Sequence, residues 1–228
     1  MALFAGDAHL RDDQPEGWET FFDFLRGPAR SSQRLYLLGD LFEAWVGDDD
    51  RRPLGERMRR ELRSVAEAGV AVCLIVGNHD FMIGEEFCAE AAVEFGGLRR
   101  LVVLAGRRLL LMHGDALDRR YRRRRIWANP AIRRLLAAKP LAERLQLAAK
   151  YAADPVGGAA APEIDERRAG RLIDSLNLDA IVHGHTHRPQ LTDAGGKRAV
   201  IPAWPQAGGA GGWIELEESG RLKLCQAD

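Results

Sequence analysis

The chain has 228 residues, of which 46% are hydrophobic, so it can bury a full core as one α/β domain, with or without a small insertion. Its 33 basic and 33 acidic residues cancel, so the net charge gives no support for a nucleic-acid partner. The three cysteines, Cys73, Cys88 and Cys225, are scattered and odd in number, which argues against a disulfide framework and favours reduced thiols in the cytoplasm. We expect neither a signal peptide nor a membrane-spanning helix, because the longest apolar runs are far shorter than a bilayer requires.

The first half of the chain alternates short apolar runs with amphipathic stretches, as βαβ units do. The predicted strands are residues 2–5, 35–38 and 70–76, and the predicted helices are residues 17–30 and 54–68. Each of these strands is followed by glycine and then a polar residue. This pattern favours buried strands whose C-terminal ends present polar side chains.

The second half contains one stretch that interrupts this alternation. A short helix near 84–92 and a hairpin of strands 101–104 and 107–112 come first, and a helix over 163–176 leads to a strand over 180–182. Between them, residues 119–153 are rich in Arg, Ala and Leu and are interrupted by Pro130 and Pro140. This stretch is either a pair of ordinary surface helices or an inserted cap beside a site. Strands near 198–203, 212–217 and 221–225 complete the prediction.

Five polar clusters follow apolar strands, and they contain all six histidines of the chain. The clusters are Gly6-Asp7-Ala8-His9, Gly39-Asp40, Gly77-Asn78-His79-Asp80, His113-Gly114-Asp115 and His183-Gly184-His185-Thr186-His187. Each one alone is weak, since a lone strand-terminal Asp is often a helix cap and an Asn-His pair is often a turn. Together they favour a metal site, because strand ends converge on one edge of an α/β sheet. Oxygen and imidazole ligands without thiolate suit Mn, Fe, Zn or Mg.

This ordered set resembles the calcineurin-like metallophosphoesterases. The resemblance implies a four-layer α/β/β/α sandwich spanning 1–228 as a single domain, with a helical cap insertion at about 119–153. It also implies two divalent metal ions. The ligands it implies are Asp7, His9, Asp40 and His187 for one ion, and Asp40, Asn78, His113 and His185 for the other.

A narrower resemblance covers most of the chain. Residues 39–50 read Gly-Asp-Leu-Phe-Glu-Ala-Trp-Val-Gly-Asp-Asp-Asp, and Asp80-Phe81-Met82-Ile83-Gly84 and His185-Thr186-His187-Arg188-Pro189 extend the match. These stretches resemble the UDP-2,3-diacylglucosamine hydrolases of lipid A synthesis. That resemblance implies Mn²⁺-dependent hydrolysis of a UDP-linked diacylated glucosamine to UMP and diacylglucosamine 1-phosphate.

The chain departs from that family at two places. His79 stands where many of those enzymes carry Arg, and Asp118-Arg119-Arg120 replaces their Cys-Thr-Asp-Asp stretch. We expect His79 and Asp40 to be catalytic, with His79 donating a proton or stabilising charge on the phosphate. Glu43 either orients His79 or is a solvated surface acid. The expected substrate contacts are Asn78, His79, Tyr121, Lys150 and His185.

The arginine run at 119–125 has three interpretations: a solvated helix face, a binding site for the diphosphate, or a surface that docks on anionic lipid. The apolar residues that follow the run favour a cap with a hydrophobic surface. Such a cap predicts a cytoplasmic protein that attaches peripherally to the inner face of the inner membrane. A metallophosphoesterase for soluble phosphodiesters or nucleotides is the alternative function. A non-catalytic scaffold is disfavoured because no ligand is lost, and the oligomeric state is left open.

Overall fold

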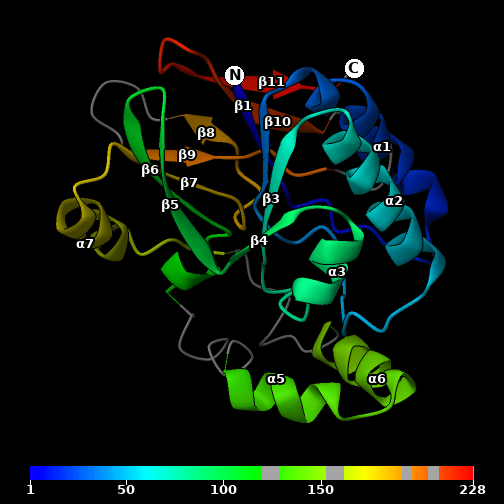
Figure 1. Ribbon diagram of the computed structural model, residues 1–228. Helices are drawn as coiled ribbons and strands as arrows, with labels where there is room; N and C mark the ends of the chain where they lie inside the picture. The colour runs from blue at the N-terminus through cyan, green and yellow to red at the C-terminus, as the bar shows by residue number, and fades with distance from the viewer. Residues whose placement is uncertain (120–128, 153–161, 192–196, 205–210, 228) are drawn as a thin grey trace.

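Two β-sheets packed face to face form the centre of the protein, and helices cover both outer faces (Figure 1). The computed structural model describes residues 1–119, 129–152, 162–191, 197–204 and 211–227. One sheet has six strands in the order β11-β10-β1-β2-β3-β4, and the other has five in the order β5-β6-β7-β9-β8. The predicted four-layer α/β/β/α sandwich is confirmed.

The six-stranded sheet is parallel at its centre and antiparallel at one side. Its strands are β1 (Ala2–Ala5), β2 (Arg34–Leu37), β3 (Ala71–Ile75), β4 (Glu94–Gly97), β10 (Gly212–Leu216) and β11 (Leu222–Gln226). β1, β2, β3 and β4 run parallel, whereas β10 is antiparallel to β1. Alternate side chains of β1 serve two cores: Leu3 faces the helices, and Phe4 packs between the sheets.

Helices cover the outer face of this sheet. They are α1 (Glu19–Arg26), α2 (Pro53–Glu67) and α3 (Glu85–Glu90), with short 3-10 turns at η1 (Pro15–Gly17) and η2 (Ala29–Ser31). Phe21 and Phe22 of α1 and Met58 of α2 are fully buried in the helix-facing core. Helix α1 is shorter than predicted because Gly27 and Pro28 follow it and end the helical hydrogen bonding.

The five-stranded sheet carries the hairpin that the sequence predicted. Its strands are β5 (Arg99–Leu104), β6 (Arg107–Met112), β7 (Ala180–His183), β8 (Gln190–Leu191) and β9 (Arg198–Val200), with η3 (Asp115–Leu117) after β6 and α7 (Glu166–Leu176) on the outer face. Ala105 and Gly106 turn the hairpin with positive φ angles of 47° and 73°. Strands β4 and β8 were not predicted, since β4 contains two glycines and β8 has only two residues.

Two helices lie apart from the sandwich, at the lower edge of Figure 1: α5 (Pro130–Ala137) and α6 (Leu141–Ala152). Pro130 begins α5, with Asn129 as its N-cap, and Pro140 directly precedes α6, so both prolines mark helix starts. The buried guanidinium of Arg144 donates to the carbonyl of Val46 at 2.6 Å and pairs with the carboxylate of Asp49. These helices are therefore docked on the loop after β2.

The arginine run falls mostly on residues 120–128, which lie outside the described residues, as does Tyr121. In the part of the chain that the structure describes, no helix is long and apolar enough to span a membrane.

Candidate metal centre

The predicted ligands come from five strand ends at one edge of the sandwich. Asp7, Asp40 and Asn78 follow β1, β2 and β3, and His113 and His185 follow β6 and β7. The loops are bonded to one another through the backbone: the Asp7 N–H donates to the Gly39 carbonyl at 3.0 Å, and the His9 N–H donates to the Asp40 carbonyl at 2.9 Å. Segments far apart in the sequence thereby present their side chains to one point.

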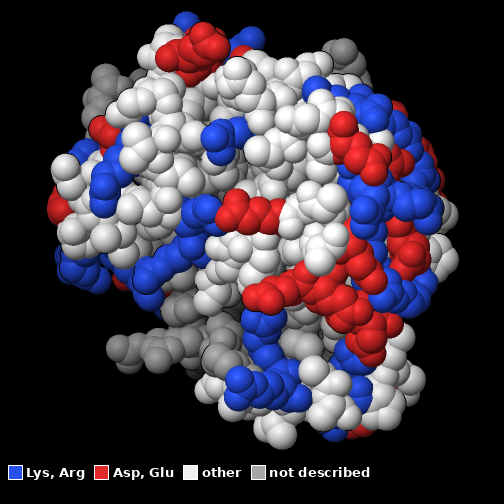
Figure 2. Space-filling view, viewed as in Figure 1, with Lys and Arg blue, Asp and Glu red and all other residues white. Residues whose placement is uncertain are grey.

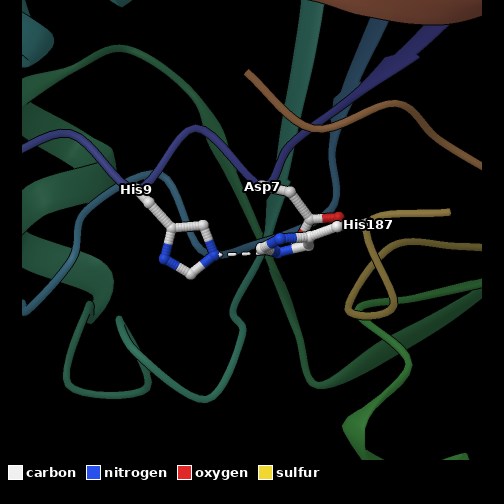
Figure 3. A group of neighbouring side chains, drawn as sticks. All are labelled: Asp7, His9 and His187. Carbon is white, nitrogen blue, oxygen red and sulfur yellow. Dashed lines mark hydrogen bonds and ion pairs between the residues drawn. The ribbon is translucent and has the colours of Figure 1, made fainter. Parts of the chain in front are cut away.

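Asp7, His9 and His187 form the first group of candidate ligands, and their side chains point toward one another (Figure 3). Nε2 of His9 lies 3.1 Å from Nε2 of His187 and 3.6 Å from a carboxylate oxygen of Asp40. A carboxylate oxygen of Asp7 lies 3.8 Å from Nε2 of His187. These donor atoms match the set that the resemblance assigned to one ion.

Asp7, Asp40 and His113 form a second, fully buried group. Nε2 of His113 lies 3.1 Å from Oδ2 of Asp40 and 3.1 Å from Oδ1 of Asn78. Its other nitrogen, Nδ1, donates to the carbonyl of Leu38 at 2.9 Å, so deprotonation of the ring would leave the lone pair on Nε2, the atom that faces the two oxygens. Asp40 faces both groups, because its Oδ2 lies 3.6 Å from Nε2 of His9 and 3.1 Å from Nε2 of His113.

His185 is brought to the cluster in a different way. Its backbone N–H donates to Asp7 Oδ2 at 2.9 Å, and its ring nitrogen Nε2 lies 3.1 Å from Oδ2 of Asp118. Asp118 is 1% exposed and was not predicted as part of the site. The available signal was its place three residues after the His-Gly-Asp motif, in the segment where the chain departs from the hydrolases. Asp118 holds the ring of a candidate ligand, as carboxylates commonly do in metal sites.

His79 lies beside the first group without joining it. Its Nδ1 bonds to the backbone carbonyl of Glu43 at 2.8 Å, and its ring packs edge-on against that of His9 with centroids 4.7 Å apart. The carboxylate of Glu43 lies closer to His9, at 3.0 Å from Nδ1, than to His79, at 4.0 Å. Glu43 therefore holds His79 by its carbonyl and His9 by its side chain.

Two expected substrate contacts are not brought to this cluster. Tyr121 lies outside the described residues, and Lys150 is exposed on α6. Within the described residues, no hydrogen bond or ion pair links Lys150 to the cluster.

The backbone is strained where the candidate ligands sit. Among the described residues, eight other than glycine have positive φ, and five of them are candidate ligands. These five are Asp7, His9, Asp40, His185 and His187. Gly77 and Gly184 leave room for the carboxylates, because a Cβ at Gly77 would collide with Asp40 and one at Gly184 would collide with Asp7. Strain of this kind is concentrated at functional sites.

The cluster concentrates charge away from water. Burial raises the pKa of Asp7 to about 6. Burial also opposes ionisation of Asp40, but the attraction of His113 and His79 outweighs it and holds the pKa of Asp40 well below the usual value. For His113, the carboxylates of Asp40 and Asp7 overcome the effect of burial and raise its pKa to about 10. Buried carboxylates that face imidazole rings are a donor set that fits divalent cations.

Two buried groups in the motifs have structural partners. The Asp80 carboxylate accepts the N–H groups of Leu41 at 2.8 Å and Gly77 at 2.7 Å, so it joins the loops after β2 and β3. His183 donates from Nδ1 to the Gly184 carbonyl at 2.8 Å and accepts from Arg198 at 2.9 Å. Although all six histidines lie in motifs, His183 is thus held by protein partners, and it belongs to none of the ligand groups found among the described residues.

A recess of about 690 Å³ opens beside the first group. One wall carries Asp7, His9, Glu43, His79 and His187. The other wall comes from the segment after β9 and from the end of β11. Its volume lies within the range of pockets that bind small molecules, about 300–1,000 Å³.

Two stacked sheets with aspartate, asparagine and histidine gathered at their strand ends define a class of two-sheet α/β proteins with a candidate metal site at this edge. A family model described as calcineurin-like phosphoesterase matches residues 2–189. The chain belongs to the calcineurin-like phosphoesterase family.

Curated relatives extend the likeness over most of the chain. A protein of Pseudomonas fluorescens (strain Pf0-1) named UDP-2,3-diacylglucosamine hydrolase is 35% identical over 96% of this chain and 93% of its own length. Proteins of the same name from Klebsiella pneumoniae and Enterobacter sp. (strain 638) are 36% and 37% identical, each over 90% of this chain and 92% of its own length.

Solved structures share the fold at low sequence identity. A structure described as a novel archaeal phosphodiesterase has a TM-score of 0.52 and 11% identity, covering 99% of this chain and 98% of the other. The hypothetical protein PH1004 from Pyrococcus horikoshii also gives 0.52, at 8% identity, over 100% of this chain and 88% of the other.

Proposed function

We propose that this chain hydrolyses the pyrophosphate bond of UDP-2,3-diacylglucosamine and releases UMP and 2,3-diacylglucosamine 1-phosphate. The observation that carries the proposal is the agreement between the relatives, which match over at least 90% of the chain, and the strand-end cluster, where Asp, Asn and His donors converge within hydrogen-bonding distance. A dinuclear site is what a phosphoryl-transfer reaction of this kind uses.

In this proposal two divalent ions are held by the converging side chains. Asp7, His9, Asp40 and His187 hold one, and Asp40, Asn78, His113 and His185 hold the other. The absence of thiolate among these donors favours Mn²⁺ over softer metals. When bound, such a pair of ions lowers the pKa of water and neutralises charge on the phosphate.

His79 acts on the substrate rather than on the metals. Because its Nδ1 is directed to the Glu43 carbonyl, its Nε2 is left for the substrate, and His79 lines the recess. In the imidazolium form, Nε2–H donates to a phosphate oxygen and stabilises the charge that develops there. Asn78 and His185, next to the metal positions, contact the same phosphate.

The helices α5 and α6 serve the lipid end of the substrate. Figure 2 shows basic side chains gathered over α5, and Leu135 and Leu147 are exposed on the two helices at 65% and 38%. Cationic groups beside exposed apolar ones suit an anionic membrane surface, where each basic residue contributes about 1 kcal/mol. The protein accordingly attaches to the cytoplasmic face of the membrane that carries its substrate.

The test measures UMP release from UDP-2,3-diacylglucosamine by Mn²⁺-loaded protein, beside hydrolysis of an aryl phosphodiester, with Asn78→Ala as the blank. Turnover of the lipid that is lost in Asn78→Ala is the expected result. Turnover of the diester alone would overturn the lipid assignment and move the protein to the soluble phosphodiesterase function.

A further inference from the structure

From the candidate metal cluster, the recess extends toward β10 and β11, whereas α5 and α6 dock on the loops after β2 and β3. In the six-stranded sheet, β10 and β11 lie on one side of β1, whereas β2 and β3 lie on the other. The recess extends from the cluster to Leu224 and Gln226 of β11. The two helices dock on the loops after β2 and β3, where Arg144 reaches Val46 and Arg133 reaches the carbonyl of Ile83 at 3.2 Å.

The two sides differ in charge. Away from the cluster, the described residues that line the recess include no Lys, Arg, Asp or Glu; they are Pro189, Pro202, Ala203, Trp204, Leu224 and Gln226, with Gly211 and Cys225. Helix α5, in contrast, carries Arg133 and Arg134. A phosphate that leaves with the sugar is stabilised on the basic side, whereas the neutral side favours an uncharged group.

The shape and polarity of the recess favour a nucleoside over an acyl chain. Pro189, Leu224 and Gln226 in its wall are exposed, so an alkyl chain bound there would stay in contact with water. The carboxamide of Gln226 offers both a donor and an acceptor, as the edge of a base requires. The rigid surfaces of Pro189 and Pro202 supply flat apolar contacts for a base.

We propose that this recess is the nucleoside subsite, which holds the ribose and base of the substrate while the phosphate bound to them sits at the metal cluster. The inference rests on the proposed function in one respect: it assigns the other end of the substrate to the side of α5 and α6. Ala203, half-buried in the wall of the recess, and Gln226 then determine selectivity for the nucleotide.

The experiment compares how phosphate monoesters bind to Mn²⁺-loaded protein, by isothermal titration calorimetry. Methyl phosphate, UMP and octyl phosphate share the phosphate and differ only in the attached group. We expect UMP to bind about tenfold or more tightly than methyl phosphate. We also expect Ala203→Phe, which fills the recess, to remove most of that advantage, while Val103→Phe, an exposed position on β5 at 66%, keeps it.

Equal affinities of UMP and methyl phosphate for the wild-type protein would overturn the proposal, and this comparison needs no variant to fold. An advantage of octyl phosphate over UMP that Ala203→Phe abolishes would also overturn it, since the recess would then be an acyl site. Lipid turnover is measured separately. Turnover without a UMP advantage rejects the subsite alone, whereas a UMP advantage without turnover rejects the lipid substrate alone.

Discussion

The carboxylate of Glu43 lies 3.0 Å from Nδ1 of His9, while Nε2 of the same ring faces His187 and Asp40. This contact raises the pKa of His9 to about 9 against the opposing effect of burial, together with the charge of Asp40. It also fixes the hydrogen of the neutral ring on Nδ1, which leaves the Nε2 lone pair for a metal.

We therefore expect Glu43→Ala to weaken binding of one ion by about 10–100-fold, because ring orientation and tautomer are no longer fixed. Glu43→Gln keeps an acceptor for Nδ1–H of His9, so we expect it to lose less metal affinity than Glu43→Ala. Titration of chelator-treated protein with Mn²⁺ measures this, with Glu94→Ala, an exposed acid on β4, as the control. Wild-type affinity in Glu43→Ala would contradict the role.

Asp118 gives a second prediction of the same kind. Its buried carboxylate holds Nε2 of His185 at 3.1 Å. Replacement by Asn removes the charge and keeps the size, so we expect the folded variant to retain about one bound ion per chain instead of two, with affinity for the second reduced about 10–100-fold. Elemental analysis after dialysis measures the stoichiometry, and Glu163→Gln, an exposed acid, is the matched control. Two tightly bound ions in Asp118→Asn would show that the contact is dispensable.

The strand-end motifs allowed much of this fold to be predicted, because apolar runs that end in Gly-polar pairs specify both a buried strand and the edge where its end lies. Partners supplied by unrelated segments could not be predicted. Asp118 and His185 are separated by 67 positions in the sequence, and Arg144 and Val46 by 98. Their pairing therefore depends on tertiary packing. The two roles of Glu43 were likewise hidden, since backbone and side chain of one residue serve different histidines.

Removal of metal is expected to destabilise the protein more as pH rises. Without metal, His9 and His113 have folded-state pKa values of about 9 and about 10, above the ordinary 6.5. The folded state therefore binds more protons than the unfolded state between pH 6.5 and 9, and its stability falls by up to about 1.4 kcal/mol per pH unit for each proton.

Metal-loaded protein should not lose stability in this way as pH rises, because its ligands are already deprotonated and metal affinity increases with pH. The difference in Tm between Mn²⁺-loaded and chelator-treated samples should therefore widen from pH 6.5 to 9. Differential scanning fluorimetry across that window tests it. A gap that stays constant or narrows would contradict the assignment of these histidines as ligands.

His183 predicts a pH dependence of the opposite sign. Burial lowers the pKa of this ring to about 3, so it stays neutral in the folded state and gains a proton on unfolding below about pH 6.5. Stability from the neutral ring is complete above pH 6.5 and is lost as pH falls toward 3.

Replacement of His183 by Asn removes the bonds to Arg198 and Gly184 and should cost about 1–3 kcal/mol at pH 7. Because Asn does not titrate, this deficit should shrink by up to about 1.4 kcal/mol per pH unit as pH falls below 6.5. Urea unfolding of both proteins at pH 7, 6 and 5 measures the deficit. The same deficit at all three values would show that the ring titrates normally in the folded state.

Arg144 supplies the last prediction, because it fixes α6 to the loop after β2. Its guanidinium donates to the carbonyls of Val46 at 2.6 Å and Lys139 at 3.0 Å and pairs with Asp49. Arg144→Met keeps the aliphatic stem and loses these bonds, so the two helices should no longer be held beside the cluster.

We expect turnover of the acylated substrate to fall about tenfold or more in Arg144→Met, and hydrolysis of a small aryl phosphodiester to change by less than about twofold. Lys139→Met is the control, since the side chain of Lys139, in the turn between α5 and α6, pairs only with Glu143 among the described residues. Equal losses on both substrates would mean that Arg144 supports the metal cluster itself.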